Sequence, residues 1–140
     1  MKVLEITNQQ LINYSMFMKT VIAKGKGARA VAKFIKTLQP TMDEYLGFEM
    51  DIVKEYSQKD EAGNLLSETN IYWISELKEK GERELKELKN ETVVISLVEL
   101  EPYIENLILA IEGTDLELCG NDLLIFDELL ETLETLKEKG

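Results

Sequence analysis

ARAVAKFIKTLQPTMDEYLGFEMDIVKEYS, residues 28–57, carries apolar side chains at helical spacing along its whole length. Steps of three and four residues place such side chains on one face of a helix. The stripe consists of Val31, Phe34, Ile35 and Leu38, followed by Met42, Tyr45, Leu46, Met50, Val53 and Tyr56. Pro40 interrupts the run, because proline lacks the N–H of a helical hydrogen bond and clashes with the preceding turn. The pattern therefore predicts a long helical segment that is either kinked at Pro40 or divided there into two helices.

Before this segment, the sequence predicts a strand, a helix and a break. Residues 2–7 alternate in polarity as in a half-buried strand. A helix follows over residues 9–23, capped by Thr7 or Asn8, and its apolar face comprises Leu11, Tyr14, Met18 and Ile22. The break is the run Lys24-Gly25-Lys26-Gly27, since glycine favours turns over helix.

After the long segment, residues 60–64 predict a turn, because Asp, Gly and Asn favour tight backbone conformations. Residues 75–90 predict a surface helix that is charged around most of its circumference and supported by Glu-to-Lys pairs. Between them, residues 70–74 favour a strand by composition but lead directly into the charged helix. We leave strand and helix open for these five residues.

The last part of the chain predicts a second strand and two more helices. Residues 92–97 are rich in β-branched side chains, which favour a strand. A helix extends from Pro102 to Gly113, and another from residue 121 to residue 137. The apolar face of the last helix is predicted to contain Leu123, Phe126, Leu130 and Leu133, with Leu129 and Leu136 beside them. We therefore expect one mainly helical α+β domain over residues 1–140, with four to five helices and a small two- or three-stranded antiparallel sheet.

Composition excludes several classes of function. The 140 residues contain no His and one Cys, so a Ser-His-Asp or Cys-His nucleophile and the usual zinc sites cannot form. No window of about 18 apolar residues is present, so we expect no membrane span. We predict a protein that is not an enzyme, with no catalytic residue, no metal site and no cofactor.

The net charge of −11 hides a separation along the chain. Residues 1–42 carry a net charge of +6, and residues 97–140 carry −10. The two ends can face each other within the fold, or each can face a different partner. A possible basic face consists of Lys26, Arg29, Lys33 and Lys36, at helical spacing. Because the whole chain is strongly acidic, we do not expect direct nucleic-acid binding.

The acidic end contains a stripe of carboxylates at steps of four, three and four residues: Asp127, Glu131, Glu134 and Glu138. A regular row of carboxylates can imitate the phosphates of a duplex and occupy a basic channel by charge complementarity. The alternative is the ordinary polar face of an amphipathic helix. Both interpretations stay open at this stage, as does self-association through the apolar face of the same helix.

The chain resembles a family of small proteins of tailed phages and prophages of Gram-positive bacteria, catalogued as domain of unknown function 1617. The resemblance covers most of the chain in four pieces. They are the N-terminal strand and first helix, the segment Lys24–Arg29 with Lys33–Lys36, the turn from Glu55 to Asn64, and the helix from Gly120 to Leu133. The family turn often carries a longer insertion after its Gly-Asn pair, and this sequence is shorter there.

The resemblance implies phage origin and a place of action in the host cytoplasm, but no activity. Small acidic phage proteins often bind a host protein. We therefore expect an antagonist of a host defence effector, for example a nucleic-acid-guided nuclease, that acts through its acidic C-terminal half. The alternative is a virion-assembly or tail-region accessory protein that binds another phage protein. An antagonist that acts through charge is sensitive to salt, whereas an assembly protein depends on exposed apolar patches.

Overall fold

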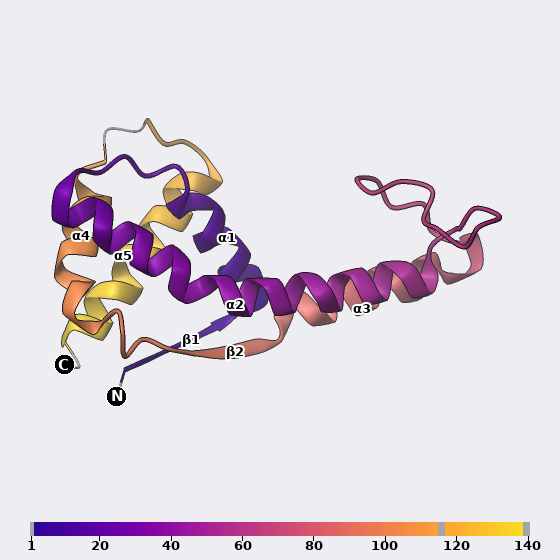
Figure 1. The fold of residues 1–140 in the computed structure, drawn as a ribbon, viewed down its shortest axis with the longest axis horizontal. Helices are drawn as coiled ribbons and strands as arrows, with labels where there is room; N and C mark the ends of the chain where they lie inside the picture. The colour runs from indigo at the N-terminus through magenta and orange to yellow at the C-terminus, as the bar shows by residue number, and fades with distance from the viewer. Residues whose placement is uncertain (1, 115–116, 139–140) are drawn as a thin grey trace.

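The computed structural model describes residues 2–114 and 117–138 (Figure 1). These residues form five α-helices and two strands: β1 (Val3–Thr7), α1 (Asn8–Met18), α2 (Gly25–Tyr56), α3 (Lys78–Asn90), β2 (Thr92–Ser96), α4 (Ile104–Glu112) and α5 (Asn121–Glu138). One turn of 3₁₀ helix precedes α3 at Ser75–Leu77, and another precedes α4 at Glu101–Tyr103. The predicted mainly helical α+β fold with a small antiparallel sheet is confirmed.

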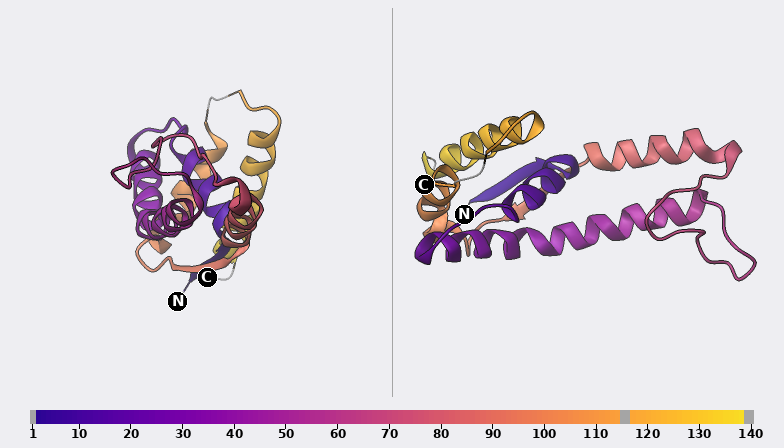
Figure 2. Two further views of the ribbon diagram at one scale, coloured as in Figure 1. Left: turned by 90° about the vertical axis from the view of Figure 1, so that its right-hand side faces the viewer. Right: turned by 90° about the horizontal axis from the view of Figure 1, so that it is seen from above.

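The molecule has two parts, which we call the body and the arm (Figures 1 and 2). The body contains the two-stranded sheet, α1, the first half of α2, α4 and α5. The arm consists of the second half of α2, of α3, which runs beside it, and of the loop over residues 57–74 at the far end. One long helix therefore belongs to both parts.

The α2 helix runs through Pro40 and connects the body to the arm. Its 32 residues span roughly 48 Å at 1.5 Å per residue. It buries Ala30, Val31, Phe34 and Leu38 in the body, and Tyr45, Val53 and Tyr56 in the arm. Because buried contacts lie on both sides of Pro40, they compensate for the missing hydrogen bond. Of the two predicted alternatives, a kinked helix or two helices, the division into two helices is excluded. The helix begins inside the predicted break, at Gly25, whose φ of +53° suits glycine.

The α1 helix begins at the predicted cap and ends earlier than predicted. The Gln10 N–H donates to Thr7 Oγ1 at 3.2 Å, and the Thr7 N–H donates to Gln10 Oε1 at 2.9 Å, which forms a capping box. The helix ends at Met18, because Thr20 donates both its N–H and its hydroxyl to a carbonyl of the last turn. Ile22, predicted to lie on the apolar face, is therefore outside the helix and 62% exposed.

The strands β1 and β2 confirm the two predicted strands and pair antiparallel, with Val3 opposite Ser96. Leu4 and Ile6 of β1 and Ile95 of β2 are buried, whereas the residues between them are partly or fully exposed. Successive side chains of a strand point to opposite faces, so one face of the sheet covers the core and the other faces solvent.

Residues 70–74 form neither a strand nor a helix. They return along the end of α2, where Trp73 and Ser57 form an isolated antiparallel bridge. The indole ring of Trp73 lies against Gly81 of α3, so closely that a Cβ atom at Gly81 would lie 2.8 Å from two of its ring carbons. Trp73 therefore joins the loop to both helices of the arm.

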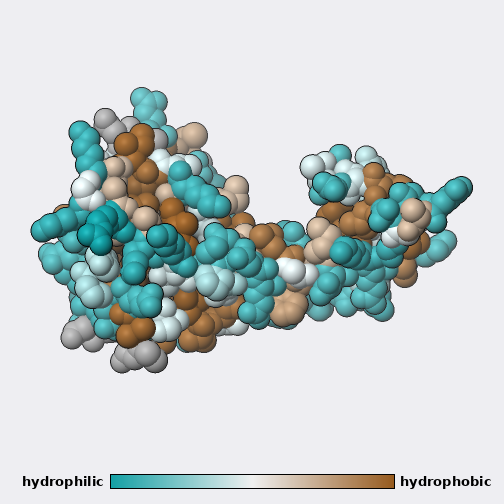
Figure 3. All heavy atoms as spheres, viewed as in Figure 1, coloured by the Kyte–Doolittle hydropathy of each residue, from teal (hydrophilic) through white to brown (hydrophobic). Residues whose placement is uncertain are grey.

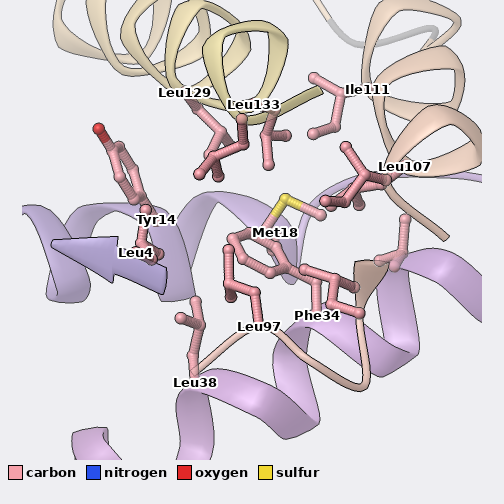
Figure 4. Close-up of a cluster of buried hydrophobic side chains, with 14 of the residues drawn as sticks. Leu4, Tyr14, Met18, Phe34, Leu38, Leu97, Leu107, Ile111, Leu129 and Leu133 are labelled. Atoms are coloured by element: carbon pink, nitrogen blue, oxygen red, sulfur yellow. The ribbon is translucent and has the colours of Figure 1, made fainter. Parts of the chain in front are cut away.

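One cluster of buried apolar side chains fills the body (Figure 4). All helices except α3 and both strands contribute to it, and its members include Leu4, Tyr14, Met18, Phe34, Leu38, Leu97, Leu107, Ile111, Leu129 and Leu133. Figure 4 shows Met18 between the side chains of α5 and α4 above it and those of α2 below. The body is thus packed as a single core.

The buried face of α5 differs from the predicted one. Leu129, Leu133 and Leu136 are buried, whereas Leu123, predicted to lie on the apolar face, is 48% exposed. The reason is that residues 121–124 at the start of α5 are all exposed and extend beyond the core. The periodicity of the sequence predicts which side of α5 is apolar, but tertiary packing determines which turns of that side are buried.

Two glycines of the arm allow a test of its packing. We expect Gly81→Ala to lower the free energy of unfolding by about 1–3 kcal/mol, because the new methyl group meets the Trp73 ring. Gly47→Ala in α2, where no atom lies within 4 Å, is expected to raise it by about 0.5–1 kcal/mol through helix propensity. Urea denaturation followed by Trp73 fluorescence measures both effects. Equal stability of the Gly81→Ala variant and the wild type would contradict the packing described.

Candidate protein-binding surfaces

The four carboxylates of the predicted acidic stripe lie along the solvent side of α5. All four are exposed, and we call them the acidic stripe: Asp127, Glu131, Glu134 and Glu138. Within residues 2–114 and 117–138, the one ion pair joins Lys137 Nζ to Glu105 Oε1 at 3.6 Å. The stripe thus holds carboxylates with no basic partner in the described structure, an arrangement that attracts a basic surface.

Glu128 of α5 forms hydrogen bonds with two side chains of α1. Its carboxylate accepts a hydrogen bond from the Tyr14 hydroxyl at 2.5 Å and another from Gln10 Nε2 at 3.1 Å. Burial, together with the hydrogen bond to Glu128, raises the pKa of Tyr14 above its ordinary value. Tyr14 is therefore a persistent donor. Its hydrogen bond adds to the burial of the leucine side of α5, which leaves the acidic stripe on the solvent side.

The predicted basic face lies at the start of α2. Lys26, Arg29 and Lys36 are exposed and Lys33 is half-buried. Both views of Figure 2 show α2 and α5 on opposite sides of the body, with α1 and the sheet between them. In the part of the chain that the structure describes, no ion pair joins the basic face to the acidic stripe. The two charged ends of the sequence therefore face in different directions.

A groove of about 690 Å³ lies beside the basic face, between the start of α2 and α4. Lys24 and Lys26 line it together with Ile22 and Leu109, which are both largely exposed. The groove thus combines positive charge with apolar contact area. It extends the basic face over one end of the body.

Two other kinds of site are not found in the described ranges. No three His, Cys, Asp or Glu side chains of residues 2–114 and 117–138 come together in a way that could hold a metal ion. None of the helices in those same ranges has the length and apolarity needed to cross a bilayer.

The far end of the arm is a third surface, which the sequence did not predict. Leu66, Ile71 and Tyr72 of the loop are 50%, 44% and 47% exposed. Figure 3 shows apolar atoms gathered at this end of the molecule. The sequence signal that could have indicated this surface is a set of apolar residues without helical spacing, between a turn and a charged helix. Exposed apolar patches of this kind are typical of protein–protein contacts.

The contact between Tyr14 and Glu128 gives a second prediction. We expect Tyr14→Phe to lower the free energy of unfolding at pH 7 by about 1–2 kcal/mol, because a hydrogen bond to a charged group is lost while Glu128 regains water. Tyr72→Phe, on an exposed side chain, serves as the control and should change little.

The same variant predicts a pH dependence. Folding raises the pKa of Tyr14 above 10, the ordinary tyrosine value. The contribution of Tyr14 to the free energy of unfolding is therefore complete below pH 10 and is lost progressively as the pH rises above 10. The stability difference between wild type and Tyr14→Phe should therefore narrow above pH 10 in urea denaturation. A difference that stays constant up to pH 11 would contradict the assignment.

No protein-family model, curated protein or solved structure matches this chain. The resemblance to the phage family therefore stays a prediction.

Proposed function

We propose that the chain is a non-enzymatic protein-binding module that antagonises a host defence effector, such as a nucleic-acid-guided nuclease. It places its acidic stripe on a basic surface of the effector and so blocks access of nucleic acid to that surface. Phage origin and action in the host cytoplasm are part of the proposal and rest on the predicted family resemblance. The partner is a protein, and the chain needs no cofactor for this role.

The observation that supports the proposal is the exposure of the whole acidic stripe without a basic partner in the described structure. Along the axis of α5, steps of three and four residues separate successive carboxylates by about 4.5–6 Å. This spacing is of the same order as the rise of about 3.4 Å between phosphates of one DNA strand. A basic channel that binds phosphates can therefore accept several of the carboxylates at once.

Charge reversal tests this function. We expect the double variant Glu131→Lys and Glu134→Lys to bind a captured host effector at least about tenfold more weakly, since two attractive contacts become repulsive. The matched control reverses two exposed carboxylates of α3, Glu79→Lys and Glu82→Lys, and keeps the same net charge. The measurement is a pull-down from host lysate, followed by calorimetric titration of the identified effector at low and high salt.

The wild type is expected to lose affinity as salt rises, because the contact is electrostatic. Equal weakening by the α3 control would assign the effect to net charge and contradict the role of the stripe. Recovery of only phage structural proteins from infected cells would contradict the antagonist function itself.

A second function, a virion-assembly or tail-region accessory protein, is supported by the apolar end of the arm. In this case the arm buries Leu66, Ile71 and Tyr72 against another phage protein, and burial of apolar area rather than charge drives binding.

For this second function, we expect Leu66→Ser together with Ile71→Ser to weaken binding to a phage structural protein at least about tenfold. The effect should persist at high salt. Val98→Ser, on a side chain of the body that is 54% exposed, is the control. Binding that is unchanged in the arm variant would exclude this function.

A further inference from the structure

In the described part of the chain, the outer edge of β1 has unpaired backbone groups. The Leu97 N–H donates to the Lys2 carbonyl and the Asn8 N–H donates to the Glu91 carbonyl, so the even-numbered residues of β1 face β2. In an antiparallel pair, the alternate residues direct their N–H and C=O groups away from the partner strand. These are Val3, Glu5 and Thr7, and the Thr7 N–H already donates to its capping partner.

Among the residues that the structure describes, Val3 and Glu5 therefore present free backbone donors and acceptors at this edge. Within residues 2–114 and 117–138, neither residue forms a hydrogen bond outside the sheet. Both side chains are exposed, Val3 to 39%. An exposed strand edge of this kind is a template for an added strand.

A groove of about 430 Å³ lies directly beside this edge, between β1 and α5. Its strand wall is formed by Val3, Leu4 and Glu5, and its helix wall by Glu131, Thr132, Thr135 and Leu136. The lining therefore includes two carboxylates, one on each wall, and no basic side chain. Glu131 belongs to the acidic stripe, so the stripe and the strand edge meet in this groove.

We propose that the groove binds an extended basic segment of the partner protein, which adds to β1 as a third strand of the sheet. This inference deepens the proposed function and rests on it for the identity of the partner. The added backbone pairs with Val3 and Glu5 at the usual spacing of about 4.8 Å. Charge complementarity selects the occupant, because Lys or Arg side chains of the added strand reach Glu5 and Glu131.

The experiment uses the full chain, labelled with ¹⁵N, and two synthetic peptides of equal charge. The probe is Val-Lys-Val-Lys-Val, blocked at both ends, and the control is Pro-Lys-Pro-Lys-Pro, which cannot form a regular strand ladder. We expect the probe to bind at least tenfold more tightly than the control. The amide signals of Val3 and Glu5 should shift, and their hydrogen exchange should slow at least tenfold.

Variants with small structural effect complete the test. Glu131→Gln should weaken binding of the probe severalfold, because it removes the charge of the helix wall. Glu138→Gln removes the same charge from the other end of the acidic stripe and should leave binding unchanged. Equal loss in both variants would show general attraction to the stripe and overturn the proposal.

The remaining outcomes separate this inference from the proposed function. If both peptides bind equally and only α5 signals shift, strand addition is excluded while attraction by the acidic stripe stands. If the probe binds along β1 but charge reversal at Glu131 and Glu134 leaves binding of the host effector intact, the groove is supported and the proposed function fails. Shifts of Val3 and Glu5 on concentrating the protein alone would assign the edge to a second copy and overturn the proposal.

Discussion

The apolar stripe of α2 must be covered over roughly 48 Å, and every other helix described in this chain is shorter. The body covers the first half of the stripe with α1, β2 and α4, and α3 covers the second half. The extended shape of the molecule follows from this division (Figure 1). A single helix covers only one side of the arm, so Leu46 and Met50 of the predicted stripe stay exposed, as does Phe48.

The same packing separates the charges of the chain. With α2 and α5 on opposite sides of the body, the basic face and the acidic stripe cannot neutralise each other by contact (Figure 2). The buried leucine side of α5, together with the contact of Glu128 with Tyr14, leaves the stripe facing solvent, and Glu131 borders the open edge of β1. Packing of the core thus determines which carboxylates are available to a partner. Part of the acidic net charge is thereby concentrated on the solvent side of α5.

Local patterns in the sequence predict those structural features that depend only on residues close together in the chain. The alternation of β1, the cap at Thr7 and the spacing of the acidic stripe all follow from such signals. The rest depends on tertiary contacts. The path of residues 57–74 is set by the Trp73 ring against Gly81, and the choice of Leu129 over Leu123 is set by the end of the core. The apolar end of the arm has no periodicity, so only the exposed area reveals it.

The relative position of the body and the arm depends on the continuity of α2 through Pro40. A distance measured between the two ends of α2 tests this continuity most directly. Spin labels are attached at Lys26→Cys and Lys54→Cys, both exposed positions of α2, after the single native cysteine is replaced by Cys119→Ser. A continuous helix predicts one narrow distance distribution near 42 Å, roughly 28 residues at 1.5 Å each. A broad distribution, or a mean well below that length, would show two helices joined at Pro40 and contradict the account.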